Sequence, residues 1–272
     1  MSQTSRTVRV VRTAVMTAAL AVGTAVAFPA GAQADSAGHV YIEVGGTGAT
    51  TATPSCPTTT SSYNSVNGAL PAGSQAVEVC YPATAGPILG PHGPLVSLNP
   101  LQVNPDALTA PTYDASEQAG YQGALKAAED AHNANPGARI TITGYSQGAE
   151  IADQVLQTIA SGSTGIPLSQ VDGMLYADPM QPGTGVLSQI PKGLGIPGVA
   201  TSAGAGPAEF NGIPVARYCI HGDFICDANL LSVQGYFTLH PLYPQAGNVM
   251  AQTLAQDGQD GVFWRNPNGS PA

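Results

Sequence analysis

Residues 139–150 read Arg139-Ile-Thr-Ile-Thr-Gly-Tyr-Ser-Gln-Gly-Ala-Glu150. The β-branched run at the start predicts a strand buried on both faces. A helix-forming run at 149–159 follows at once, so the pattern Gly-x-Ser-x-Gly falls on a tight turn between strand and helix. The two glycines let neighbouring backbone approach closely, and the helix N-terminus favours negative charge near the Ser146 hydroxyl.

The rest of the chain repeats this alternation of strands and helices. The predicted strands are 40–44, 76–81, 171–176 and 215–220, and the predicted helices are 118–133 and 244–256, with a loose tail after them. Such alternation is typical of a mainly parallel central sheet flanked by helices. Together with the serine turn, it predicts an α/β-hydrolase fold.

A serine hydroxyl is a weak nucleophile unless a base lies within hydrogen-bond reach and an acid orients that base. In α/β-hydrolases the order along the chain is serine, acid, histidine. Two histidines follow Ser146, and Asp223 precedes the second of them, His240, inside the short loop between Cys219 and Cys226. We therefore predict Ser146 as nucleophile, His240 as general base and then acid, and Asp223 as the acid that orients His240.

Other residues compete for these roles. His221 is only two positions from Asp223, so the two are poorly placed to form a pair aimed at a third residue, and His221 is predicted to be a solvated loop histidine. Asp172 and Asp178 lie near the end of the 171–176 strand and are alternative acids, although an aspartate before proline is typical of a turn. His39 and His92 lie before the serine and are out of order.

The oxyanion that forms during acyl transfer needs two N–H donors. One is expected from Gln147, the residue after the nucleophile. The other is expected from the loop Gly45-Gly46-Thr47-Gly48, where Thr47 adds a hydroxyl. This glycine-rich loop matches neither the Walker nor the dinucleotide fingerprint, so phosphate binding is not predicted.

Four cysteines in an exported chain point to two disulfides, for which three pairings exist. Cys219 and Cys226 are close in sequence and bracket a tight loop, which leaves Cys56 to pair with Cys80. The rival interpretation is a metal site made from one loop: Cys219, His221, Asp223 and Cys226. Zinc sites usually need a second ligand pair at a comparable spacing, and the sequence has none, so neither a metal nor another cofactor is predicted.

Residues 1–34 have the features of a secretory signal peptide. The basic residues at its start are Arg6, Arg9 and Arg12. An apolar stretch at 13–28 follows, and Ala32-Gln33-Ala34 fits the small-x-small cleavage rule, with Ala30-Gly31-Ala32 as the alternative site. We expect 35–272 to form a single domain with its core at about 38–257. No apolar stretch is long enough for a membrane span, so the mature protein is expected outside the cell or at the cell envelope.

Charged residues are few and mostly acidic, with 17 Asp and Glu against 8 Lys and Arg. Loss of the three leader arginines shifts the formal net charge from −9 to about −12. An acidic surface argues against nucleic acids and anionic lipids as partners. It agrees with a monomer that acts on neutral or apolar substrates.

Two segments break the rhythm of strands and helices. The insertion at about 183–214 is rich in Gly, Pro, Ala and Ile, and unstructured segments of this length are usually functional or disordered. Its apolar residues suggest a flap or a surface for acyl chains, with an inert surface excursion as the alternative. A second Pro- and Gly-rich loop at 87–100 has apolar residues to line the same pocket: Ile88, Leu89, Leu95 and Val96.

Three motifs together resemble the cutinase family of serine esterases: Gly144-Tyr-Ser-Gln-Gly-Ala149, Cys219-x-x-x-Asp-x-x-Cys226 and His240-x-x-Tyr243. Val79-Cys-Tyr-Pro-Ala83 is similar to that family's second strand. Asp178-Pro-x-x-Pro-Gly183 and the apolar segment after it look more like the related actinobacterial PE-PPE hydrolase domain. The resemblance covers about 38–257.

The resemblance implies a secreted enzyme that cleaves small-molecule or lipid carboxylic esters through an acyl-enzyme, without a metal or cofactor. It assigns Ser146, Asp223 and His240 to the triad, and Thr47 and Gln147 to the oxyanion hole. The long 183–214 insertion and the short interval between the first two cysteines differ from typical cutinases. Shorter esters, lipids and cell-envelope acyl esters therefore compete with cutin as substrates. An acyltransferase on the same triad and a non-catalytic binding protein on this scaffold are the alternatives.

Overall fold

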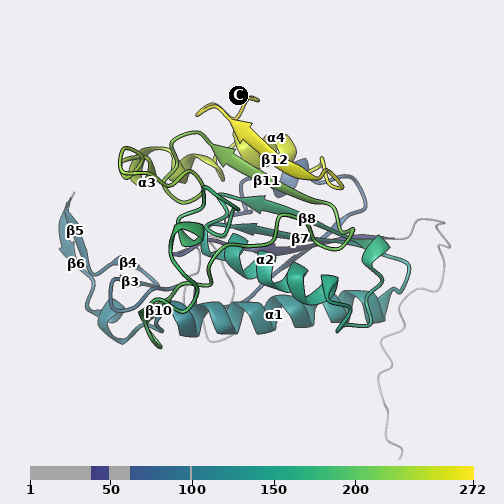
Figure 1. Cartoon of the computed structure of the whole chain (residues 1–272), viewed down its shortest axis with the longest axis horizontal. Coiled ribbons are helices and arrows are strands. Elements are labelled where there is room, and N and C mark those ends of the chain that lie inside the picture. Colours follow the sequence, from purple (N-terminus) through teal and green to yellow (C-terminus); the bar gives the residue numbers. More distant parts are fainter. Residues whose placement is uncertain (1–37, 49–61, 99) are drawn as a thin grey trace, which may run out of the picture. The chain divides into compact units, whose positions relative to one another are not determined.

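Strand β7 (Arg139–Tyr145) lies inside a six-stranded sheet whose order is β12-β11-β8-β7-β1-β2. The other strands of this sheet are β1 (His39–Val44), β2 (Gln75–Glu78), β8 (Val171–Tyr176), β11 (Val215–Ile220) and β12 (Gly261–Arg265). Every neighbouring pair in it is parallel, as Figure 1 shows. The predicted parallel sheet flanked by helices is confirmed, and the chain has an α/β-hydrolase fold.

The computed structural model describes residues 38–48, 62–98 and 100–272. These residues belong to one unit of the chain, Ala37–Ala272. The predicted signal peptide and Cys56 lie outside the described residues. Among the residues described, no helix is both long enough and apolar enough to cross a membrane.

Helices cover both faces of the sheet. The α-helices are α1 (Tyr113–Ala134), α2 (Gln147–Ala160), α3 (Gly235–Thr238) and α4 (Val249–Thr253). The short 3-10 helices are η1 (Asn67–Ala69), η2 (Pro105–Thr109), η3 (Leu168–Gln170), η4 (Leu187–Gln189) and η5 (His240–Leu242). Helices α1 and α2 pack side by side on one face, and α4 lies on the other (Figure 1).

Alternation along the strands divides the core into two layers. Val40, Ile42 and Ile140 point toward α1 and α2, where they join the buried aliphatic residues of α2. Tyr41 and Met174 point to the opposite face. Since successive strand side chains alternate between faces, both layers are set by the same short runs of sequence.

The layer on the α4 side is unusually rich in buried tyrosines. The Tyr41 hydroxyl donates to Asp257 (3.0 Å), and those of Tyr63 and Tyr176 lie 2.9 and 3.0 Å from threonine hydroxyls. A buried hydroxyl without a partner is costly. These hydrogen bonds let tyrosines fill the volume of a core without that penalty.

Helix α1 begins earlier than the sequence suggested, at Tyr113 rather than at 118. The reason is a cap, because the Thr112 side chain accepts from the amide of Ala115 (3.3 Å) and so satisfies a free donor of the first turn. Small residues on α1 allow close packing. A Cβ at Gly120 would lie 2.5 Å from Ile151 of α2.

Two predictions for the last part of the sequence differ from the structure. The tail after 256 is not loose, since β12 pairs in parallel with β11 and forms an edge of the sheet. The sheet therefore extends past the predicted core limit of 257. The expected helix at 244–256 is reduced to α4, which starts after the side chain of Asn248 caps the amide of Val249 (2.8 Å).

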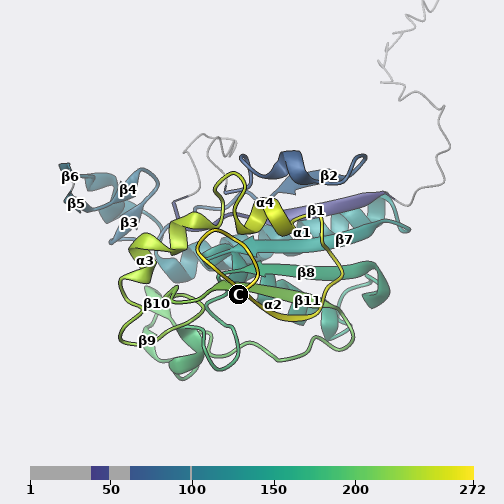
Figure 2. The same ribbon diagram turned by 90° about the horizontal axis from the view of Figure 1, so that it is seen from above.

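Three two-stranded antiparallel sheets of the described residues lie outside the main sheet. They are formed by β3 (Leu89–Gly90) with β4 (Gly93–Pro94), β5 (Val96–Leu98) with β6 (Leu101–Val103), and β9 (Gly195–Ile196) with β10 (Ala200–Thr201). These hairpins lie within or beside the two segments that break the rhythm of the sequence. Seen from above (Figure 2), β3, β4, β10 and α3 gather at the same end of the sheet.

The buried position of Glu43 predicts that the stability of the folded protein depends on pH. Glu43 is buried on β1, where it accepts one hydrogen bond from Asn67 (3.0 Å) while its other oxygen has no partner. Burial raises the pKa of Glu43 to about 7, from 4.5. Between pH 4.5 and 7 the Glu43 carboxyl is ionised in the unfolded chain but still protonated in the folded protein. The free energy of unfolding therefore falls as the pH rises from about 4.5 to 7.

We expect Glu43→Gln to raise the free energy of unfolding by up to about 3 kcal/mol at pH 8, and by little at pH 4. Urea denaturation at both pH values measures this difference. Glu129→Gln, at an exposed position on α1, is the matched control. An equal effect of Glu43→Gln at both pH values would contradict the argument.

Candidate active site

The turn after β7 holds Ser146 at φ 58° and ψ −124°, a conformation that residues other than glycine rarely adopt. The Ser146 amide donates to the carbonyl of Tyr176 (3.0 Å). Helix α2 begins at the next residue. A Cβ at Gly144 would lie 2.0 Å from the carbonyl oxygen of Gly148, and a Cβ at Gly148 would lie 2.0 Å from that of Val44. Both glycines are therefore required by close backbone contacts.

A chain of hydrogen bonds joins the three residues predicted as the triad. Ser146 Oγ lies 2.8 Å from His240 Nε2, and His240 Nδ1 lies 2.9 Å from Asp223 Oδ2. Asp223 is fully buried and His240 nearly so. The imidazole thus has one nitrogen on a carboxylate and the other on the serine, which is the arrangement that lets histidine take a proton from the hydroxyl.

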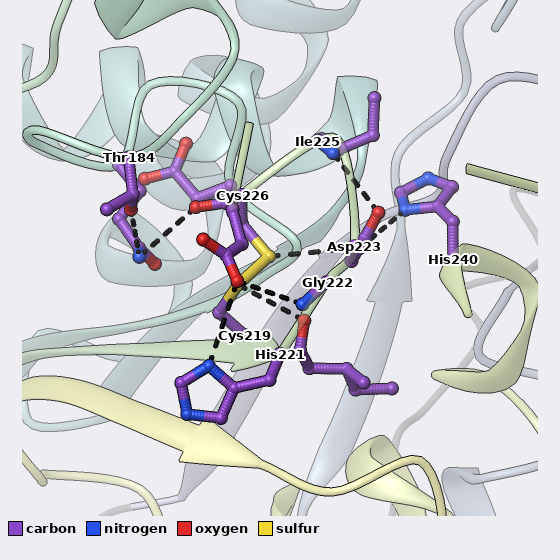
Figure 3. Close-up of a disulfide and its surroundings, with 12 residues drawn as sticks. Thr184, Cys219, His221, Gly222, Asp223, Ile225, Cys226 and His240 are labelled. Carbon is purple, nitrogen blue, oxygen red and sulfur yellow. Dashed lines mark hydrogen bonds and ion pairs between the residues drawn. A yellow bond between two sulfur atoms is a disulfide. The ribbon is translucent and has the colours of Figure 1, made fainter. Parts of the chain in front are cut away.

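A disulfide closes the loop that carries the acid (Figure 3). Cys219, at the end of β11, is bonded to Cys226, with their Cα atoms 5.9 Å apart, so this predicted pairing is confirmed. Within the loop, the second oxygen of Asp223 accepts from the amide of Ile225 (3.1 Å). Cys80 is also disulfide-bonded, whereas its predicted partner Cys56 lies outside the described residues.

Aromatic rings hold the histidine. Tyr145 stacks on the His240 ring with 4.9 Å between centroids, and its hydroxyl donates to the His240 carbonyl (2.6 Å). Tyr236 of α3 is also stacked on His240, at 5.5 Å. The sequence analysis missed these roles. An aromatic residue directly before the serine of Gly-x-Ser-x-Gly was the available signal for Tyr145.

Thr47 and Gln147 lie together beside the serine, as predicted. The Thr47 hydroxyl donates to the side-chain oxygen of Gln147 (3.2 Å), whose amide group donates to the carbonyl of Thr84 (3.3 Å). As the first residue of α2, Gln147 has a backbone N–H without an intrahelical acceptor. These contacts leave a helix-terminal donor close to Ser146.

The alternative acids and His221 have other partners. Both oxygens of Asp178 are engaged, one by Arg217 Nε (2.9 Å) and one by the amide of Met180 (2.8 Å). Asp172 binds Arg139 (2.6 Å). His221 is largely exposed and stacks on Trp264. The prediction that His221 is a solvated loop residue agrees with this position.

Arg217 is the centre of a buried ionic cluster. It binds Asp178 and also Asp153 of α2, both at 2.9 Å. Burial raises the pKa of each carboxyl, and the guanidinium opposes this effect. The sequence analysis overlooked this cluster, although an arginine within the apolar run of β11 is a signal for a buried ion pair.

The two out-of-order histidines considered above, His39 and His92, lie away from the serine. His92 contacts Asp106, and His39 Nε2 lies 2.7 Å from the hydroxyl of Thr141. His39 starts β1, so it lies at the end of the parallel sheet opposite to Ser146.

Two groups of possible metal ligands among the described residues have other bonding partners. The sulfurs of Cys219 and Cys226 are bonded to each other, so they are not thiolate ligands. A grouping of His39, Asp172 and Asp257 brings possible ligand atoms within 4.8 Å of one another. The guanidinium of Arg139 binds both of these aspartates, at 2.6 and 2.7 Å, and thus supplies the positive charge there.

Ser146 opens into a pocket of about 800 Å³ with mostly apolar walls. The two segments that break the rhythm of the sequence supply much of the lining. From the first come Ile88, Leu89 and Pro94, and from the second Val186, Leu187, Ile190, Leu194, Gly195, Ala200, Thr201 and Ser202. The expectation that both segments line one pocket holds for Ile88 and Leu89, whereas Leu95 and Val96 are not among the lining residues.

The chain is similar to known proteins in sequence and in structure. A sequence model of one family, described as Cutinase, matches residues 42–256. No curated protein sequence matches significantly. The catalytic core domain of acetyl xylan esterase from Trichoderma reesei is similar in structure, with a TM-score of 0.48 and 20% identity, over 81% of this chain and 96% of that one.

Two further solved structures are similar. A cutinase-like protein from Cryptococcus sp. has a TM-score of 0.47 and 19% identity, covering 80% of this chain and 90% of its own. Lysin B from Mycobacteriophage D29 has a TM-score of 0.44 and 18% identity, covering 80% of this chain and 81% of its own.

The contact between Gly148 and β1 yields a stability prediction. We expect Gly148→Ala to lower the free energy of unfolding by about 3 kcal/mol, because the added methyl group meets backbone that cannot move aside without shifting β1 or α2. Gly165→Ala is the control, since a Cβ there has nothing within 4 Å. Urea denaturation of both variants measures the difference, and equal stabilities would contradict the proposed contact.

Proposed function

The chain belongs to the cutinase family, and from this premise we propose that it is a secreted serine esterase that works through Ser146, His240 and Asp223. Carboxylic-ester hydrolysis is the activity of this family. The observation that carries the proposal is the unbroken series of hydrogen bonds from Asp223 through His240 to Ser146. It ends at an apolar pocket large enough for an ester.

In the proposed first half-reaction, Ser146 Oγ attacks the ester carbonyl while His240 Nε2 takes the hydroxyl proton. Asp223 stabilises the imidazolium that results. The tetrahedral oxyanion accepts hydrogen bonds from the backbone N–H of Gln147 and from Thr47. His240 then gives its proton to the departing alcohol oxygen, which leaves the acyl group on Ser146.

Water completes the proposed cycle. His240 takes a proton from a water molecule that attacks the acyl-enzyme. The second tetrahedral intermediate then collapses as His240 returns this proton to the departing Ser146 Oγ, which releases the carboxylic acid and restores the serine hydroxyl. The residues supply all proton transfers, so the proposed reaction uses no metal or cofactor. An acyltransferase would follow the same path with an alcohol in place of water.

Export is part of the proposal. The basic and apolar pattern of residues 1–34 supports a cleaved signal peptide. The disulfide between Cys219 and Cys226 is consistent with an oxidising compartment. We therefore place the mature protein, 35–272, outside the cell or at its envelope, where it acts as a monomer on small-molecule or lipid esters.

The nucleophile assignment predicts the behaviour of Ser146→Ala. This variant should fold normally but lose ester hydrolysis, with kcat lower by about 10⁶-fold, as expected when a nucleophile is removed. Hydrolysis of p-nitrophenyl butyrate and labelling by a fluorophosphonate probe both measure it. Ser161→Ala, an exposed serine at the end of α2, is the control. Normal turnover by Ser146→Ala would reject the assignment.

The assignment of Asp223 as the acid of the triad predicts different effects for substitutions at Asp223 and Asp178. Asp223→Asn should lower kcat by about 10⁴-fold, because the wrong tautomer of His240 is then favoured. Asp178→Asn should act on stability instead, since it weakens the Arg217 ion pair. Kinetics and thermal unfolding of both variants distinguish these effects. A larger loss of kcat in folded Asp178→Asn than in Asp223→Asn would exchange the two roles.

A further inference from the structure

We infer that the substrate carries a long acyl chain, and that hairpin β9–β10, fastened to helix α1 by Asp114, covers this chain in the pocket. The inference rests on the proposed function and specifies its substrate class. It concerns the walls of the pocket rather than the triad, so it can be tested separately.

The pocket walls suit an alkyl chain better than a polar acyl group. Six polar side chains line the pocket beside Ser146, and five of them already donate a hydrogen bond within the protein: Thr47, Tyr113, Gln147, Thr201 and Ser202. The sixth, Tyr236, is stacked on His240. A sugar or peptide in this space would find few free donors. Apolar side chains supply the rest of the surface and gain from burial of methylene groups.

The position of His240 separates the two ends of an ester. The departing alcohol must lie beside His240, which gives it a proton. Tyr236 stacks on that ring and, with Phe237, lines the pocket, so α3 lies on the alcohol side. The walls left for the acyl group are those from the 85–94 loop and from the 186–202 segment.

Asp114 fastens the hairpin from the first turn of α1. Its carboxylate accepts from the amides of Gly198 (3.0 Å) and Thr201 (2.7 Å) and from the Thr201 hydroxyl (2.8 Å). Its own amide donates to the carbonyl of Val199 (3.2 Å). One residue thus binds both the turn and the second strand of the hairpin.

Leu194 connects this cover with the pocket. It precedes β9, lines the pocket and is still 59% exposed. Substitution there is therefore tolerable for folding while it changes the apolar wall. Leu230 is a matched control, because it is 94% exposed and is not among the pocket-lining residues.

The first experiment compares kcat/KM for p-nitrophenyl octanoate and acetate, both below the concentration at which the octanoate aggregates. Each buried methylene is worth about fourfold, so burial of only about two of the extra methylenes of the octanoate should favour it by about 10-fold or more. Leu194→Asp should reduce this ratio by about 10-fold, and Leu230→Asp should leave it unchanged. Preference for acetate, or equal ratios in the two variants, would overturn the inference while leaving the esterase proposal intact.

The role of Asp114 has its own test. As a positioning residue for the cover, Asp114→Ala should raise KM for the octanoate ester several-fold with a smaller change in kcat. Asp130→Ala, an exposed ion-pair residue on the same helix, should change neither. A loss of kcat alone, or an equal rise of KM for acetate and octanoate, would contradict the fastening of an acyl cover.

A binding measurement separates this inference from the esterase proposal. Calorimetric titration of laurate into the Ser146→Ala variant measures binding of an acyl chain without turnover. Saturable binding that Leu194→Asp weakens about 10-fold supports the acyl site even where no ester is hydrolysed. Absence of saturable binding would reject the acyl site, whatever the activity of the unmodified enzyme.

Discussion

The close approach of helix α2 to the end of strand β1 is the contact on which the rest of the site depends. Gly148 faces the carbonyl of Val44 without room for a side chain, which fixes the start of α2 against the loop after β1. The same contact brings Thr47 within hydrogen-bond distance of Gln147. The contact between α2 and β1 therefore holds both the turn that carries the nucleophile and the candidate oxyanion donors. Within this turn Ser146 keeps its rare backbone conformation.

The sequence predicted what depends on short-range pattern. Strands β8 and β11 have the expected limits, and Ser146, Asp223 and His240 meet as their order suggested. It failed where distant segments decide the structure. Strand β12 exists because β11 offers a free edge, which no local pattern in a Gly- and Asn-rich tail reveals. The aromatic support of His240 by Tyr236 likewise depends on how α3 folds back.

Few lysine and arginine side chains are present to balance the charges of the carboxylates. Residues 35–272 contain only five Lys and Arg residues. Two of them each form ion pairs with two carboxylates: Arg139 at the start of strand β7 and Arg217 within strand β11. Arg217 joins α2, the end of β8 and the carbonyl of Pro207, so it also anchors the insertion that lines the pocket. Removal of one partner from such a buried group leaves the other charge uncompensated.

The last strand has a bearing on how the chain matures and how it can be modified. During synthesis β11 is made before β12, so the backbone groups of its outer edge have no partner until β12 follows, and an open edge invites pairing with other chains. Even the amide of the terminal residue, Ala272, donates to Trp264 (3.1 Å). A carboxyl-terminal fusion would therefore start from ordered structure, and it needs a spacer, whereas trimming the terminus would uncover the strand that leads into the disulfide loop.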